Sequence, residues 1–290
     1  MPKKLSILVA GSTGKQGGAV ARLLLEKGHH VRALTRKAES VAAKALAARG
    51  AEIVTGSLDD RASLDRALAG TDAVFAMTTP FEAGVEAEAR QGITTVDAAK
   101  AAGAFLVFTS VGSANRATGI PHFDSKFEVE QHIAKVRAPA AILAPVYFMD
   151  NAVAFTRDQL RAGVFATPLA PKTKLAQIAI EDIAACAVEA FENRDRFEGK
   201  RYDLAGDELT GEQATVILSR VTGKAFSYFA VPMEIIRAQM GEDGAKMYEW
   251  FERTGYAFDR AALASAFPRV RWHSFEGWAK KQDWKGIFAV

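Results

Sequence analysis

Closely spaced glycines near the amino terminus are the first residues whose types and spacing indicate chemistry. Gly11, Gly14 and Gly17 separate a short apolar run from a helical pattern. Glycine permits a tight turn there and lets the backbone approach a pyrophosphate, while free amides at the helix start favour an anion. The pattern predicts a dinucleotide-binding loop, the alternative being a glycine-rich turn that binds nothing. The residues of this loop are Gly11, Ser12, Thr13, Gly14, Lys15, Gln16 and Gly17.

Basic residues follow the second apolar run, at the point that distinguishes two dinucleotides. An acidic side chain there binds the ribose 2′-hydroxyl of NAD, whereas a cation accommodates the 2′-phosphate of NADP. The chain has Arg36 and Lys37 at this point, and the planar guanidinium of Arg36 offers a two-point grip on a phosphate. We therefore predict that NADP(H) is preferred over NAD(H), the alternative being that Arg36 is a solvated surface charge.

Polar segments also follow the third and fourth apolar runs. Ser57 and Leu58 are expected to lie over the adenine, and Thr78, Thr79 and Pro80 are expected to flank the nicotinamide ribose. Loops on a rigid scaffold commonly carry binding residues, but ordinary turns at strand ends have the same composition. Both interpretations stay open for these two segments.

Short apolar runs alternate with helical patterns through the first half of the chain, and these elements must position the residues above. Strands joined by helical crossovers run parallel, and a sheet covered on both faces needs apolar runs rather than alternation. The predicted fold class is therefore α/β, with a doubly wound parallel sheet that binds ligands beyond the carboxyl ends of its strands. The expected strands are 5–10, 30–35, 52–55, 73–77, 105–110 and 140–145, and the expected helices are 17–27, 40–49, 62–68, 86–102 and 124–136.

The alternating pattern breaks after Asn151. A proline-containing stretch, a helix near 181–192 and a short strand near 202–204 follow it. We predict an NAD(P)-binding domain over residues 1–151 and a smaller α/β lobe over residues 152–290. The lobe is expected to be discontinuous, to return in places to the main domain and to cover the cleft.

Composition narrows the setting of the protein. Lys and Arg number 37 against 34 Asp and Glu in 290 residues, and this small, mixed excess argues against a nucleic-acid partner. No apolar run approaches the ~20 residues of a membrane span. The lone Cys186 excludes an intrachain disulfide and disfavours zinc, so we expect a reducing, cytoplasmic setting and no metal.

Longer motifs resemble a known family. The stretches GSTGKQGGAVARLLLEKGHHVRALTR, HFDSKFEVEQHI and PVYFMDN together are similar to the NmrA-like family of atypical short-chain dehydrogenases, and most similar to its NADPH-sensing branch. The likeness continues to the terminal FEGWAKKQDW. It implies a Rossmann domain that holds NADP in its cleft. It also implies that Lys126 contacts the nicotinamide ribose and that Tyr147, Phe148 and Asn151 lie at the nicotinamide end.

One position departs from the short-chain dehydrogenases that reduce carbonyls. Those enzymes place a tyrosine four residues before the lysine, whose ammonium lowers the pKa of the phenol. Here His122 stands at that position, and Ser110 ends the fifth strand at the place of the dehydrogenase serine. We expect Lys126 to push the pKa of His122 down, toward a neutral imidazole that can still polarise a carbonyl. His122 and Lys126 are thus the candidate catalytic residues, the alternative being a helix-start residue and a ribose contact.

Two functions fit these observations. The first is an NADPH-dependent reductase of a small electrophile such as a quinone, an enone or a carbonyl compound, since hydride transfer needs chiefly orientation and a dry pocket. The second is a non-catalytic sensor of the NADPH/NADP ratio, which the resemblance to co-regulators implies and which requires two states of different ligand affinity. The expected partner is a small-molecule substrate or another protein, and a homodimer is also open.

Overall fold

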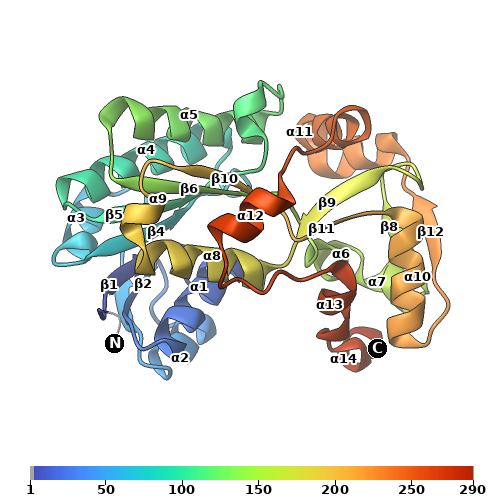
Figure 1. Ribbon diagram of the computed structural model, residues 1–290, viewed down its shortest axis with the longest axis horizontal. Coiled ribbons are helices and arrows are strands. Elements are labelled where there is room, and N and C mark those ends of the chain that lie inside the picture. The colour runs from blue at the N-terminus through green and yellow to red at the C-terminus, as the bar shows by residue number, and fades with distance from the viewer. Residues whose placement is uncertain (1–2, 290) are drawn as a thin grey trace.

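A seven-stranded parallel sheet forms the centre of the larger part of the molecule (Figure 1). The computed structural model describes residues 3–289. The strand order is β10-β6-β5-β4-β1-β2-β3, and every neighbouring pair in it is parallel. The strands are β1 (Ser6–Val9), β2 (His30–Thr35), β3 (Glu52–Thr55), β4 (Ala73–Met77), β5 (Phe105–Thr109), β6 (Ala140–Pro145) and β10 (Arg201–Leu204). The order reverses between β1 and β4, which is where sheets of this type bind ligands.

Helices cover both faces of this sheet (Figure 1). One face carries α1 and α8, which pack against each other, and the other face carries α3, α4 and α5. The helices are α1 (Lys15–Glu26), α2 (Val41–Ala47), α3 (Arg61–Leu68), α4 (Val85–Ala101), α5 (Pro121–Val136), α8 (Ile180–Glu192) and α9 (Arg194–Phe197). Burial on both faces explains why Ile7, Leu8 and Val9 are consecutive and all fully buried. The predicted doubly wound α/β fold is confirmed.

The largest difference from the predicted elements concerns the start of α5. The strands agree with the predicted ranges to within a residue, but α5 begins at Pro121 rather than near residue 124. Proline suits the first helical position, because an N–H there would have no partner within the helix. His122 and Lys126 therefore both lie on α5, one turn apart.

The smaller part of the molecule holds two short sheets (Figure 1, right). One sheet joins β7, β9 and β11, and the other joins β8 and β12. These strands are β7 (Tyr147–Phe148), β8 (Val164–Thr167), β9 (Lys174–Ile178), β11 (Asp207–Thr210) and β12 (Ser227–Ala230). Between them the chain returns to the larger part, where α8 packs on α1 and β10 pairs with β6. The division of the chain at residue 151 stays a prediction.

The helices of the smaller part are short except for α10 and α11. They are α6 (Asn151–Phe155), α7 (Arg157–Arg161), α10 (Gly211–Thr222), α11 (Met233–Arg253), α12 (Arg260–Ala266), α13 (Phe275–Lys280) and α14 (Trp284–Phe288). The long helix α11 kinks at Gly241, whose φ of 72° only glycine adopts readily. Within residues 3–289, no helix combines the length and apolar character needed to cross a membrane.

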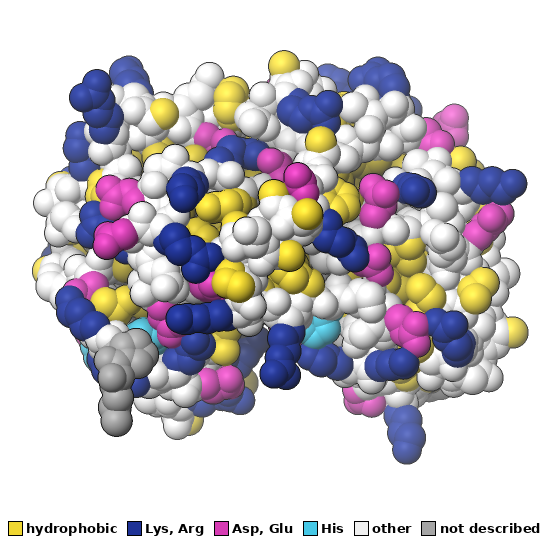
Figure 2. Space-filling model, viewed as in Figure 1, with side chains coloured by type: hydrophobic (Ala, Val, Ile, Leu, Met, Phe, Trp, Pro, Cys, Tyr) yellow, Lys and Arg dark blue, Asp and Glu magenta, His cyan; other side chains and the backbone are white. Residues whose placement is uncertain are grey.

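Charged side chains of both signs are interspersed over the face shown in Figure 2. Many form ion pairs at the surface, such as Arg61 with Asp65 at 2.7 Å and Lys280 with Glu276 at 2.7 Å. The viewed face therefore carries a mixture of charges rather than a continuous basic stripe.

Candidate functional site

A cleft of about 630 Å³ lies beyond the carboxyl ends of β1, β2, β3 and β4. The loops after these four strands line it, together with the last residues of β2 and β4, residues of α1, α2 and α4, and Phe148 of β7. Of the predicted cofactor residues, the lining includes Gly11, Thr13, Gly14, Lys15, Gln16, Arg36, Ser57, Leu58, Thr78, Thr79 and Phe148. It does not include Ser12, Gly17, Pro80, Lys126 or Tyr147. The fold thus brings most of the predicted cofactor residues to one cleft.

The glycine loop is closely packed against its surroundings. Gly11 has a φ of 64°, and a Cβ atom there would lie 2.6 Å from the Met77 sulfur. A Cβ atom on Gly17 would lie 2.4 Å from the Gly11 carbonyl oxygen. Helix α1 starts after Gly14 with no side-chain cap and no acidic residue in its first turn. Its first N–H groups are therefore suited to a phosphate, and the close packing leaves no room for side chains.

Two polar residues of the loop are used to hold it in place. The Ser12 hydroxyl is buried and donates to the Leu34 carbonyl oxygen of β2 at 3.0 Å. The Thr109 hydroxyl of β5 donates to Gln16 Oε1 at 3.0 Å. These bonds fix the loop against strands on either side of β1, so Ser12 shapes the loop rather than lining the cleft.

Arg36 is held by an acidic residue that sequence reasoning missed. Its two terminal nitrogens contact the two carboxylate oxygens of Glu82 at 2.8 and 3.0 Å. Glu82 lies on the loop after β4 and also lines the cleft. The hydrogen bond and charge of Glu82 raise the pKa of Arg36, while the side chains remain 64% and 57% exposed. The group predicted to grip a phosphate thus already contacts a carboxylate.

Lys126 is paired with a fully buried carboxylate. Its Nζ donates to Glu88 Oε1 at 2.6 Å and to the Thr78 carbonyl oxygen at 3.0 Å. The Glu88 side chain is 0% exposed, and it also accepts from the hydroxyls of Ser125 at 2.6 Å and Thr78 at 3.3 Å. An ammonium has three N–H donors, so one remains for a ligand beside the end of β4.

His122 does not line the cleft, although it lies one turn from Lys126. Its Nδ1 contacts Asp243 Oδ1 of α11 at 2.7 Å, so the imidazole joins α5 to the smaller part of the molecule. Burial acts to raise the pKa of Asp243, but the hydrogen bond and charge of His122 outweigh it and the pKa is lowered. The expected influence of Lys126 on His122 assumed an unpaired ammonium, whereas Glu88 neutralises that ammonium at 2.6 Å.

Ser110 directly follows β5, as expected, but it does not line the cleft. Its hydroxyl donates to Glu130 Oε1, and both residues are buried. Glu130 also accepts from Arg201 Nε at 2.8 Å, and a second nitrogen of Arg201 contacts Asp203 at 2.5 Å. The hydroxyl of Ser110 is thus committed to a structural ion-pair network, because Glu130 needs its bonds while buried.

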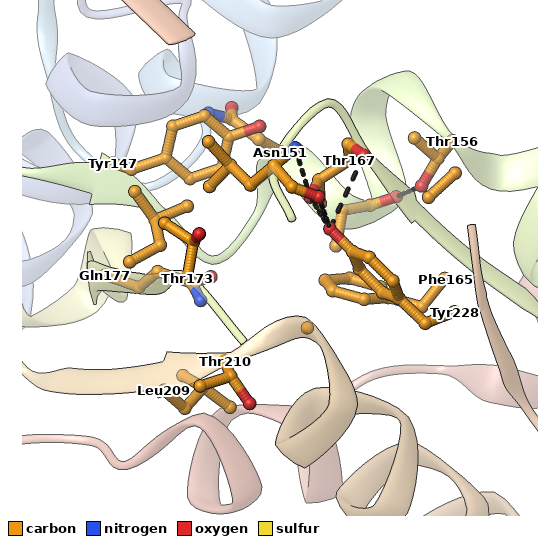
Figure 3. Close-up of a pocket in the computed structure, with 15 residues that line it drawn as sticks. Tyr147, Asn151, Thr156, Phe165, Thr167, Thr173, Gln177, Leu209, Thr210 and Tyr228 are labelled. Atoms are coloured by element: carbon orange, nitrogen blue, oxygen red, sulfur yellow. Dashed lines mark hydrogen bonds between the residues drawn. The ribbon is translucent and has the colours of Figure 1, made fainter. Parts of the chain in front are cut away.

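Tyr147, Phe148 and Asn151 divide between two cavities. Phe148 lines the cleft, whereas Tyr147 and Asn151 line a second pocket inside the smaller part (Figure 3). Burial raises the pKa of Tyr147, against the opposing hydrogen bonds to Tyr248, at 3.1 Å between the hydroxyls, and to Asn151. The residues that line this second pocket are uncharged, namely Tyr147, Asn151, Ala152, Thr156, Phe165, Ala166, Thr167, Leu169, Thr173, Leu175, Gln177, Leu209, Thr210, Gly211 and Tyr228.

An aromatic cluster joins the two parts of the molecule. The ring centroid of Phe123 on α5 lies 6.0 Å from that of Trp250 and 6.3 Å from that of Tyr256. Tyr248 and Phe251 belong to the same buried cluster. These aromatic residues therefore pack as core between the two parts of the molecule.

Four carboxylates near the predicted site residues were missed by sequence reasoning, namely Glu82, Glu88, Glu130 and Asp243. One of them carried a detectable pattern. Glu88 shares a helix face with Gly92, Val96 and Ala99, which are small or apolar and buried in α4. A carboxylate in phase with such a face needs a buried partner. The other three resemble ordinary charged residues of loops and helices.

The sheet order and the glycine loop at its switch point define a Rossmann-type nucleotide-binding fold. The model of the NmrA-like family matches residues 3–279. The chain therefore belongs to the NmrA-like family, as its motifs indicated.

Relatives of this chain include two reductases. A (4-alkanoyl-5-oxo-2,5-dihydrofuran-3-yl)methyl phosphate reductase of Streptomyces griseus is 32% identical over 270 residues, which is 91% of each chain. An NAD(P)H azoreductase of Xenophilus azovorans is 30% identical over 81% of this chain and 80% of its own.

Solved structures share the fold over nearly the whole chain. The NADPH-dependent quinone oxidoreductase QOR2 of Escherichia coli, in complex with NADPH, has a TM-score of 0.79 and 25% identity, covering 94% of this chain and 98% of its own. The negative transcriptional regulator NmrA, in complex with NAD, has a TM-score of 0.82 and 20% identity, covering 96% and 95%. Similar structures thus hold either NADPH or NAD.

Proposed function

We propose that this protein is an NADPH-dependent reductase of a small electrophile, with a quinone, an enone or a carbonyl compound as the substrate class. The observation that carries the proposal is the cleft itself. Arg36 after β2, the glycine loop after β1 and the end of β4 follow one another along the cleft in the order of the sheet, with Lys126 bonded to the end of β4. This is the order of the adenosine ribose, the pyrophosphate and the nicotinamide ribose along a dinucleotide.

The chain's own residues divide the work of holding NADP(H). The N–H groups at the start of α1 would take the pyrophosphate, and Arg36 would take the 2′-phosphate. Ser57 and Leu58 would cover the adenine, and Thr78, Thr79 and Pro80 would flank the nicotinamide ribose. We assign the free N–H of Lys126 to a hydroxyl of that ribose, with Tyr147 and Phe148 at the nicotinamide end.

The reduced nicotinamide, when bound, supplies the hydride for this chemistry. We assign His122 as the proton donor to the substrate. Asp243 contacts its Nδ1, which leaves Nε2 to donate the proton. No tyrosine stands at this position, so we expect activated acceptors, which need little proton assistance, to react best. The quinone and azo reductases among similar proteins support this choice.

The proposal is tested by following NADPH oxidation against a panel of 1,4-benzoquinone, 2-cyclohexenone and an aromatic aldehyde. Wild-type protein should turn over the quinone fastest. His122→Gln should slow the aldehyde most, because unactivated carbonyls depend on proton transfer worth ~10²–10⁴-fold. His132→Gln is the matched control, since His132 is also on α5 and also contacts an aspartate, Asp97, at 2.7 Å. Absence of turnover with every acceptor would refute the reductase function.

A second candidate function is supported by the way the predicted catalytic groups are bound. Ser110, His122 and Lys126 all contact carboxylates of the protein, and the His122–Asp243 pair joins α5 to α11. In a sensor of the NADPH/NADP ratio, the bound cofactor would change this contact between α5 and α11, and the change would alter binding to another protein or to a second copy of the chain. Hydrogen exchange in α11 that differs between NADPH and NADP would support sensing, and identical exchange would exclude it.

A further inference from the structure

The charge at the end of β2 is not what the local sequence indicates. Arg36 and Lys37 are cations, which favour a 2′-phosphate. The fold adds an acid to the same place, since Glu82 arrives from the loop after β4, 46 residues along the chain. We propose that Glu82 is a second determinant of cofactor choice, one that opposes NADP(H) and supports NAD(H). This inference rests on the proposed function, because it concerns the same cleft.

The geometry of the pair makes Glu82 a direct competitor of a phosphate. Both of its carboxylate oxygens contact Arg36, at 2.8 and 3.0 Å, in the paired arrangement that a phosphate would also use. A 2′-phosphate at Arg36 would therefore have to displace a carboxylate and would be repelled by it. Because both side chains are more than half exposed, solvent screens the pair and it can open.

The same carboxylate suits a cofactor without the phosphate. A ribose 2′-hydroxyl is a hydrogen-bond donor, and an acidic side chain near the end of the second strand is its usual acceptor. Glu82 can accept this bond while Arg36 continues to balance its charge. The other acid in this part of the cleft is Asp59. Its two carboxylate oxygens accept from Gln91 Nε2, at 3.1 and 3.0 Å, and one of them also accepts from the Ser57 hydroxyl. Glu82 is therefore better placed than Asp59 for this role.

These opposing charges would let one cleft take either cofactor. With NADP(H), Arg36 exchanges Glu82 for the phosphate. With NAD(H), the pair stays closed and Glu82 takes the hydroxyl. The preference for NADP(H) is then the difference between two opposing residues, and it is weaker than Arg36 alone would give.

The experiment measures dissociation constants by isothermal titration for NADP, NAD, 2′,5′-ADP and 5′-ADP. The last two nucleotides isolate the 2′-phosphate from the nicotinamide. Glu82→Gln should raise the ratio of the NAD to the NADP dissociation constant by up to about fivefold, since an exposed charge pair is worth at most ~1 kcal/mol. The ratio for 5′-ADP and 2′,5′-ADP should rise in the same direction.

Glu86→Gln is the matched control, because it removes the same charge from an exposed position at the start of α4 that does not line the cleft. It should leave both ratios unchanged. In an Arg36→Gln background, Glu82→Gln should tighten NADP binding less than it does in the wild-type background, because only the repulsion of the phosphate is then relieved. Ratios that stay constant or fall in Glu82→Gln would overturn the inference alone. Wild-type protein that binds none of the four nucleotides would overturn the proposed function and this inference together.

Discussion

The glycine loop in the cleft and the neighbouring region of β5 and α5 differ in what the chain leaves available to a ligand. At the glycine loop, α1 starts with no side-chain cap and no acid in its first turn. In the region of β5 and α5, which does not line the cleft, Ser110, His122 and Lys126 each contact a carboxylate of the protein itself. The first region is arranged to receive an anion, whereas the polar groups of the second region are already paired.

This difference separates cofactor binding from catalysis in this fold. Binding at the glycine loop depends on backbone geometry, which glycine spacing determines locally. Chemistry in the region of β5 and α5 depends on side chains whose partners come from α4, α5 and α11. A motif residue at the expected position is therefore not yet a free catalytic group. The following changes test that contrast, from the largest expected effect to the smallest.

The largest effect is expected at Lys126. Lys126→Met leaves the fully buried Glu88 carboxylate without its counter-charge, and breaking a buried pair costs ~3–5 kcal/mol of unfolding free energy. Adding Glu88→Gln should recover most of that loss. Urea unfolding measures both variants. Arg61→Ala, which breaks an exposed pair worth at most ~1 kcal/mol, is the control. A loss at Lys126 no larger than at Arg61 would show that the pair is not structurally important.

The glycine loop should be sensitive to a single methyl group. A Cβ atom at Gly17 would lie 2.4 Å from the Gly11 carbonyl oxygen, whereas one at Gly14 would lie 3.3 Å from the same atom. Overpacking of this kind costs ~1–3 kcal/mol, so Gly17→Ala should weaken NADP binding by about 5- to 160-fold. Gly14→Ala should have a smaller effect. Equal losses in the two variants, measured by calorimetry, would argue against the close packing as the cause.

Arg36 should matter only for the phosphorylated cofactor. Arg36→Gln removes charged hydrogen bonds worth ~1.5–3 kcal/mol, partly offset because Glu82 loses its partner too. We expect NADP affinity to fall by about tenfold and NAD affinity to change little. Lys44→Gln, at an exposed ion pair with Glu39, is the control for lost surface charge. Unchanged NADP affinity would show that Arg36 is only a surface charge and does not contact the 2′-phosphate.

The smallest expected effect is a pH dependence of stability from His273. The hydrogen bond to Asp182, at 2.6 Å, raises the pKa of His273 against burial and against nearby Lys281. Its protonated form stabilises the fold fully below the ordinary value of 6.5. That contribution, at most ~1 kcal/mol, is lost as the pH rises through the raised pKa. Chemical unfolding between pH 6 and 8 should show this slope in wild-type protein and in His132→Gln, but not in His273→Gln.

The sequence predicts the scaffold better than the site because the two depend on interactions of different range. Apolar runs and glycines determine β1 and the loop after it within about a dozen residues, and the family and fold are confirmed. The contacts of Glu82 with Arg36 and of Asp243 with His122 span 46 and 121 residues. No local sequence pattern predicts which helix or loop will contact which strand end. These two pairs of residues can therefore be identified only in the folded structure.

The central claim is that the cleft after β1 binds NADP(H), and titration of NADPH into the wild-type protein and Gly17→Ala tests it most directly. We predict saturable binding to one site per chain, tighter for NADPH than for NADH, and strongly weakened in Gly17→Ala while the variant remains folded. Absence of binding, or affinity that Gly17→Ala leaves unchanged, would contradict the account.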